Sequence, residues 1–93
     1  MSVFALNYTY GGPAEVLAEH RPAHRAFLRQ LHERGTNLAS GPLGEDGALI
    51  LLRADSAEDV ARLIQDDPLV VHGAVTGHEI REWSVTIGSV GPA

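Results

Sequence analysis

His24 is the residue of this sequence whose position carries the most chemical information. It falls on a helical stripe whose other members are apolar: Leu17, Phe27, Leu28 and Leu31. Its imidazole is therefore expected to face the body of the protein, either as a core histidine satisfied by a hydrogen bond or as a general base. If the helix begins at Pro22, His24 lies in the first turn, where the positive end of the helix dipole disfavours an imidazolium and favours a neutral ring.

Two adjacent carboxylates form the second candidate feature, in the run Asp66-Asp67-Pro68 at the end of a predicted helix. An aspartate before a proline is typical of a turn. Alternatively, Asp67 could reach His24, orient its ring and stabilise the protonated form during turnover. The sequence leaves both interpretations open.

The remaining histidines give little support to a metal site. His20 precedes His24 by four residues, so the two rings could chelate a metal if the helix continued through Pro22. No further ligand follows at a recognised spacing, and His32, His72 and His78 are predicted to be solvated. We expect no metal and no other cofactor, because phosphate-loop and dinucleotide-binding motifs are also missing from the sequence. A nucleophile elbow of the Gly-x-Ser-x-Gly type is missing too, so covalent catalysis is not supported.

Composition excludes several classes of protein. The formal net charge is −5, with 12 acidic and 7 basic side chains and no run of basic residues, which argues against nucleic acid as a partner. There is no cysteine, and no apolar run approaches the roughly 20 residues that span a bilayer. The first residues do not resemble an export signal, so a cytoplasmic location without membrane association is expected.

The apolar pattern predicts six elements in the order strand, helix, strand, strand, helix, strand. Apolar residues fall at helical spacing from 14 to 34, but Pro22 predicts a break or kink at Arg21, with the regular helix starting at Pro22. Ser56 and Asp59 resemble a capping box for the second helix. One domain is expected over 1–88, followed by a loose tail over 89–93. The expected elements are 3–10, 22–34, 36–43, 48–53, 57–66 and 75–87.

This order predicts an α+β fold, in which a four-stranded antiparallel sheet carries both helices on one face. The unbroken apolar run 48–53 indicates a central strand, and Trp83, Val85 and Ile87 are expected to alternate inward on the last strand. The face of the sheet without helices would then be partly apolar. We therefore expect a homodimer that pairs through this face.

Several short runs together resemble the YciI-like (YCII-related domain) family. They are Arg21-Pro22-Ala23-His24, Ser40-Gly41-Pro42-Leu43, Asp67-Pro68 and a last strand closing on Trp83, and the similarity extends over nearly the whole chain to about residue 83. The resemblance implies a ferredoxin-like βαββαβ fold and a dimeric α+β barrel made by stacking two sheets.

The resemblance also implies a small-molecule enzyme with a histidine and an aspartate in a cleft, since some relatives eliminate halide from chlorinated aromatic intermediates. It implies that His24 is the base, Asp67 its partner, and Arg21 or the backbone near Ser40 and Gly41 a contact for substrate or oxyanion. The chain departs from many relatives in its short turn at 44–47, where longer loops can cover the cleft, and in carrying the additional His20.

Three hypotheses for function follow. The first is proton transfer on a small metabolite, by elimination or isomerisation, with His24 removing the proton. The second is a non-catalytic ligand-binding or accessory dimer, in which the same cleft holds a small molecule without turnover. The third is that His24 only stabilises the core or the dimer.

Overall fold

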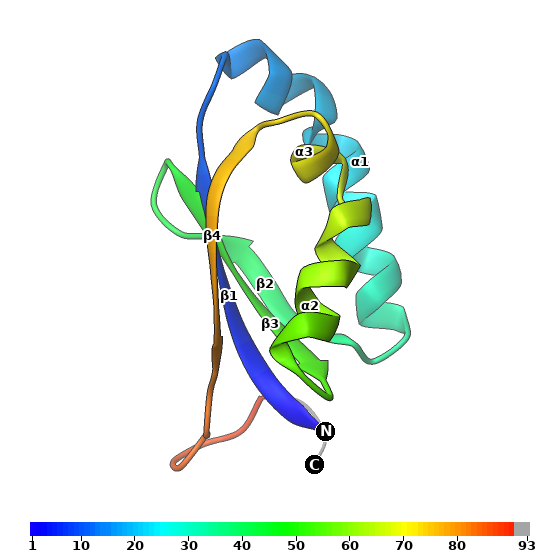
Figure 1. Ribbon diagram of the computed structural model, residues 1–93, viewed down its shortest axis with the longest axis vertical. Coiled ribbons are helices and arrows are strands. Elements are labelled where there is room, and N and C mark those ends of the chain that lie inside the picture. Colours follow the sequence, from blue (N-terminus) through cyan, green and yellow to red (C-terminus); the bar gives the residue numbers. More distant parts are fainter. Residues whose placement is uncertain (91–93) are drawn as a thin grey trace.

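The computed structural model describes residues 1–90, which form one sheet covered on one side by helices (Figure 1). The part of the expected tail at 91–93 lies outside the described residues. The elements in chain order are β1 Ser2–Tyr10, α1 Ala14–Glu33, β2 Asn37–Pro42, β3 Gly47–Ala54, α2 Ala57–Leu63, the 3-10 turn η1 Ile64–Asp66, α3 Pro68–Val71 and β4 Val75–Glu82.

The four strands are antiparallel and lie in the order β2-β3-β1-β4. β1 and β3 are the central strands, and Leu6 of β1 pairs with Ile50 of β3 on one side and Ile80 of β4 on the other. This is the predicted α+β arrangement with helices on one face, and β3 occupies the central position expected from its apolar run. The described residues include no helix long and apolar enough to cross a membrane.

Alternation along the strands builds the core between sheet and helices. On β1, Phe4, Leu6 and Tyr8 are buried in turn, because successive side chains of a strand point to opposite faces. Ile50 and Leu52 of β3 join them on the same face. The helical layer closes the core with further buried side chains, namely Leu31 of α1, Val60 of α2 and Ile64 of η1.

The long helix differs from the sequence-based expectation, since α1 runs without interruption from Ala14 to Glu33 with Pro22 in its interior. Pro22 has no N–H to donate to the carbonyl of Ala18. Both residues are exposed, so water can solvate the freed carbonyl, while the apolar stripe further along the helix holds it on the sheet. The predicted break at Arg21 is wrong, and His24 therefore lies in the middle of a helix rather than in a first turn.

The last strand is shorter than expected, because β4 ends at Glu82. Its neighbour β1 begins at Ser2, and the N–H of Trp83 donates to the carbonyl of Val3 at 2.8 Å as the final ladder bond. Beyond that point no partner strand remains. Trp83 and Ile87 are 41% and 94% exposed, so the predicted inward alternation to Ile87 is wrong.

The segment between α2 and β4, expected to be a plain connection, contains the one-turn helix α3. Asp67 caps it: the carboxylate accepts the N–H of Leu69, and Pro68 occupies the first helical position, where its missing donor costs nothing. α3 packs against α1 (Figure 1). This packing brings Asp67 to the helix that carries His24.

Candidate functional site

Asp67 is the fixed centre of the site, because its side chain is fully buried and accepts hydrogen bonds from three parts of the chain. Tyr8 donates its hydroxyl to Oδ2 at 2.8 Å, and the N–H of Leu69 donates to Oδ1 at 3.0 Å. The third donor is His24, whose Nδ1 lies 2.9 Å from Oδ1 and 2.8 Å from Oδ2. An ionised carboxylate only accepts, so these contacts make Nδ1 the protonated nitrogen of His24.

The other ring nitrogen of His24, Nε2, is not engaged by Asp67. The residue is only 5% exposed, and it lines a cleft whose lining does not include Asp67. Nδ1 is occupied by the carboxylate, and no described residue contributes a hydrogen bond to Nε2. In the neutral ring with a proton on Nδ1, Nε2 is a free acceptor.

Tyr8, on the central strand β1, holds the Asp67 carboxylate through the hydrogen bond from its hydroxyl. Burial raises the pKa of its phenol well above the ordinary value, and the nearby charge of Asp67 and the hydrogen bond to it add to the effect. Tyr8 therefore remains a neutral donor to Asp67 throughout the ordinary pH range. Its ring lies beside that of His24, with centroids 6.2 Å apart and planes tilted by 41°.

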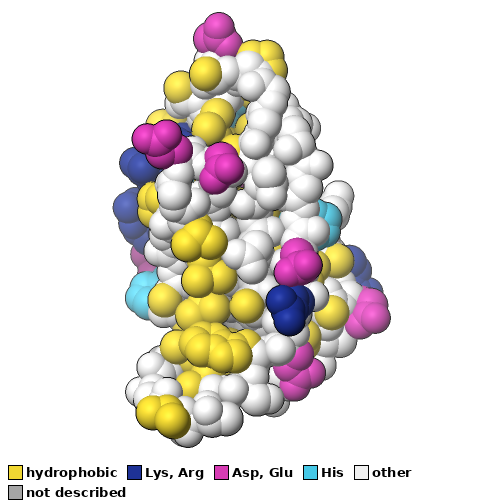
Figure 2. Space-filling view, turned by 90° about the vertical axis from the view of Figure 1, so that its left-hand side faces the viewer, with side chains coloured by type: hydrophobic (Ala, Val, Ile, Leu, Met, Phe, Trp, Pro, Cys, Tyr) yellow, Lys and Arg dark blue, Asp and Glu magenta, His cyan; other side chains and the backbone are white. Residues whose placement is uncertain are grey.

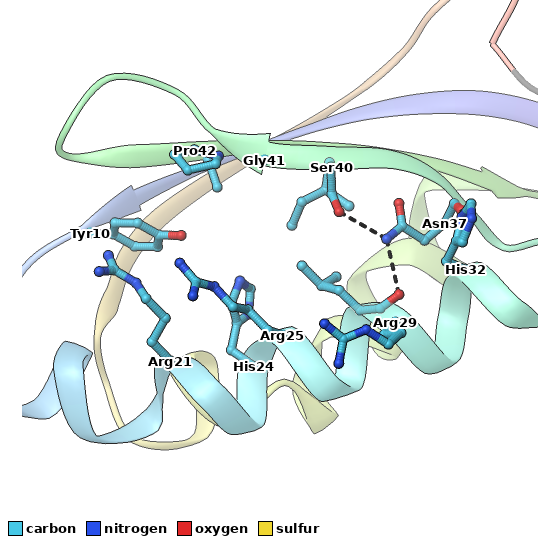
Figure 3. A pocket seen from close by; sticks show the side chains of 13 residues that line it. Tyr10, Arg21, His24, Arg25, Arg29, His32, Asn37, Ser40, Gly41 and Pro42 are labelled. Carbon is cyan, nitrogen blue, oxygen red and sulfur yellow. Dashed lines mark hydrogen bonds between the residues drawn. The ribbon is translucent and has the colours of Figure 1, made fainter.

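The cleft holds about 350 Å³ and lies between α1 and the β2–β3 side of the sheet (Figure 3). One wall comes from α1 and carries three arginines beside His24. The opposite wall comes from the strands and is mostly apolar or small. The lining residues are Tyr10, Arg21, His24, Arg25, Leu28, Arg29, His32, Asn37, Ser40, Gly41, Pro42, Ala48 and Ile50.

The residues that the sequence suggested as substrate contacts all reach this cleft. Arg21, Ser40 and Gly41 line it together with His24, while Asp67 lies behind the ring. The hydroxyl of Ser40 accepts a hydrogen bond from Asn37 Nδ2 at 3.0 Å, which leaves its own O–H free to donate to a ligand. The Arg21 guanidinium lies over the Tyr10 ring, 5.9 Å from its centroid.

Sequence reasoning missed several residues of the site. Tyr8 could have been found from its alternation with Phe4 and Leu6, which places it inward on a central strand. Tyr10 lines the cleft; burial raises the pKa of its phenol, opposed by the charge of Arg21. His32 is not merely solvated, since its Nδ1 is 2.7 Å from the carbonyl oxygen of Asn37. For Arg25 and Arg29, the sequence offered only their four-residue spacing from Arg21 as an indication of a shared helix side.

His20 lies outside this contact network even though the helix continues through Pro22. Its ring stacks on that of His72, with centroids 3.6 Å apart and planes within 3° of parallel. Within residues 1–90, no group of three or more metal-ligating side chains is placed to hold an ion. His78 is exposed on β4.

Comparison with known proteins places the chain in a family. The model of the YCII-related domain matches residues 1–84, so this protein belongs to the YCII-related domain family. Among curated proteins no match was found.

A solved structure with the same fold is 5-chloro-2-hydroxyhydroquinone dehydrochlorinase (TftG) from Burkholderia phenoliruptrix AC1100, in complex with 2,5-dihydroxybenzoquinone. The TM-score is 0.76 at 20% sequence identity, over 88% of this chain and 93% of that one. The comparison establishes the shared fold.

Proposed function

We propose that this protein is a small-molecule enzyme that catalyses proton transfer, by elimination or isomerisation, with His24 as the general base. The observation that carries the proposal is the contact between Nδ1 of His24 and both oxygens of the fully buried Asp67. A carboxylate on Nδ1 sets the tautomer in which Nε2 can accept a proton. That nitrogen is the one left to the cleft.

The chemical step follows from this tautomer. Nε2 takes a proton from a C–H or O–H group of the substrate, and the electron pair of the broken bond forms a C=C or C=O bond. In an elimination the leaving group sits on a saturated carbon next to the new bond, or on one joined to it through a C=C bond that shifts by one position; the bond to the leaving group breaks, and the leaving group departs with both electrons as an anion. A chlorinated hydroquinone meets this requirement in its keto tautomer, in which the carbon that bears chlorine is saturated. In an isomerisation an existing C=C bond shifts by one position, and the carbon at its far end takes the proton back from His24. His24 ends the elimination as an imidazolium and loses the proton to water.

Asp67 and Tyr8 act as positioning residues in this scheme. The imidazolium formed on proton uptake donates from Nδ1 to a carboxylate that has no exposed surface, so the charge pair forms in a site of low dielectric. Tyr8 and the Leu69 N–H keep the carboxylate in place by donating to its two oxygens. The ring is therefore held ready before substrate binds, which is the preorganisation that catalysis requires.

The cleft also offers hydrogen-bond donors to negative charge that develops on the substrate. The Arg21 guanidinium and the Ser40 hydroxyl both line the cleft, and neither is committed as a donor to a described carboxylate. We assign Arg21, Ser40 and the backbone at Gly41 to substrate binding. The related fold of a dehydrochlorinase that binds a hydroxylated quinone supports an elimination on an oxygenated ring as the first reaction to examine.

We also propose that the working form is a homodimer paired through the outer face of the sheet. Figure 2 shows apolar side chains running down the middle of this face, with charged side chains to either side. Ala5 of β1 and Leu51 of β3 are cross-strand neighbours there, and Leu49 lies two residues along. Leu51 is already buried, whereas Ala5 and Leu49 keep partly exposed surface. Covering such a stripe would stabilise the dimer by roughly 25 cal/mol for each Å² of apolar surface removed from water.

Chloride release tests the proposed chemistry. With 5-chloro-2-hydroxyhydroquinone as the probe, the wild type should release chloride faster than buffer does, and His24→Gln should abolish the difference. His78→Gln removes an exposed histidine outside the cleft and serves as the matched control. Saturable binding of the probe by the wild type without chloride release would instead indicate a non-catalytic binding module.

A further inference from the structure

Three arginines gather on one wall of the cleft although the chain as a whole is acidic. Arg21, Arg25 and Arg29 are spaced four residues apart on α1, so they share one side of the helix. They are three of only seven basic residues in a chain of formal net charge −5. No aspartate or glutamate lines the cleft with them, so the local charge has the opposite sign to the net charge.

These cations lack carboxylate partners in the part of the chain that the structure describes. The four ion pairs found there are His20–Glu19, His24–Asp67, Arg62–Asp59 and Arg81–Glu79. The Arg21 guanidinium contacts the face of the Tyr10 ring instead. Three guanidinium groups placed side by side without counter-charges repel one another, and an anionic ligand would relieve that repulsion.

Figure 3 shows how the side chains are directed: Arg21 and Arg25 extend from α1 toward Tyr10 at one end of the cleft, next to His24, while Arg29 lies further along. Arg21 is half-buried, whereas Arg25 and Arg29 are exposed. The site for an anion is therefore the end formed by Arg21 and Arg25. The two planar forks suit a carboxylate, which accepts paired hydrogen bonds from a guanidinium.

The rest of the cleft suits a ring. Leu28 of α1 and Ala48 and Ile50 of β3 supply apolar lining, and the cleft holds about 350 Å³, enough for one small molecule. Such a ring would lie between the apolar strand wall and His24. A carboxylate at one end would then fix which carbon faces Nε2.

We propose that the natural ligand is a small planar carboxylic acid, held by its carboxylate on Arg21 and Arg25 with its ring against Leu28, Ala48 and Ile50. This inference builds on the cleft of the proposed function, and it adds the charge class of the substrate. It makes Arg25 a specificity-determining residue.

Ligand titration followed by NMR of the backbone amides tests the inference, with benzoate as the probe and benzamide as its uncharged counterpart. Benzoate should shift the amides lining the cleft saturably and bind about tenfold more tightly than benzamide. Arg25→Gln and Arg21→Gln should each remove most of that preference, whereas Arg25→Lys, which keeps the charge but loses the fork, should remove part of it. Arg34→Gln, at the end of the same helix and outside the cleft, should keep the wild-type preference.

Equal affinities for benzoate and benzamide, or a preference that survives both glutamine variants, would overturn the inference. Thermal melting of each variant separates a lost contact from a lost fold. Chloride release is an independent readout: release by a protein that does not prefer benzoate leaves the proton-transfer proposal standing without this one. A clear benzoate preference in a protein that releases no chloride would support the carboxylate site and contradict the proposed elimination.

Discussion

The Nδ1 atom of His24 lies 2.8 Å from Oδ2 of Asp67 and 2.9 Å from Oδ1, although 43 residues separate the two in sequence. The long helix α1 carries one partner, and the cap of the one-turn helix α3 carries the other. The same carboxylate thus orients the imidazole and caps the helix. A change at Asp67 is therefore expected to affect both stability and activity.

Asp67→Asn should lower both properties. The amide keeps one acceptor oxygen but turns an NH2 group toward donors, so at least one buried donor loses its partner, at a cost of about 1 to 3 kcal/mol. Because the ring loses its tautomer control, turnover should fall by roughly a hundredfold or more. Urea denaturation and chloride release measure the two effects. Asp66→Asn, at the exposed neighbouring aspartate, should behave like wild type, and equal losses in both variants would contradict the account.

Tyr8→Phe should destabilise the protein and change how its stability depends on pH. Loss of the hydroxyl leaves Oδ2 of Asp67 with one partner fewer, at about 1 to 2 kcal/mol. The native pKa of Tyr8 is raised above the unfolded value near 10, so its contribution is full below pH 10 and falls as the pH rises further.

Urea denaturation at a series of alkaline pH values checks this sign. Above pH 10 the wild type should lose up to about 1.4 kcal/mol per pH unit through Tyr8, and Tyr8→Phe should lose correspondingly less. Parallel pH profiles of the two proteins in this range would contradict the assigned direction.

Pro22→Ala should stabilise the protein. The substitution restores an N–H donor to the carbonyl of Ala18 within a helix that is already continuous, and an interior proline costs about 3 kcal/mol. Greater freedom of the unfolded chain offsets part of this, so a net gain of about 1 to 2 kcal/mol is expected in chemical denaturation. A net loss would mean that the ring of Pro22 is needed to place the arginine-bearing half of α1.

Leu49→Glu should convert the proposed dimer into a monomer. Leu49 lies on the outer face of β3, because its neighbour Ile50 points into the core, and the proposed pairing would bury a carboxylate there without a partner. Light scattering coupled to size-exclusion chromatography gives the mass directly. Val71→Glu is the matched control, because Val71 is an exposed apolar residue on α3, 61% exposed. A wild-type protein that is already monomeric would contradict the pairing.

Periodicity was enough to predict most of the fold. Alternation along β1, the apolar run of β3 and the cap at Ser56 are local signals, and the structure has these elements where they were expected. Pro22 and Trp83 show where local reasoning fails. The preference of a proline was overridden by packing of the later half of the helix on the sheet, and the end of β4 is set by where its neighbour β1 begins.

The candidate site was predictable only in part. His24 was suggested by its place on an apolar stripe, and Asp67 by the pair of carboxylates before Pro68 and by the family resemblance. Their contact depends on how α3 packs on α1, which no spacing in the sequence reveals. The arginines of the cleft have regular helical spacing, but the same spacing is equally typical of a solvated helix face. Only the position of the strands opposite α1 distinguishes a cleft wall from an open surface.

Nitrogen-15 NMR of the His24 ring tests the central claim most directly, because it reports which ring nitrogen carries the proton. We expect the neutral ring to carry its proton on Nδ1, with Nε2 unprotonated, and to lose this preference in Asp67→Asn. A ring protonated on Nε2 in the wild type, or a tautomer that does not respond to Asp67→Asn, would contradict His24 as the general base.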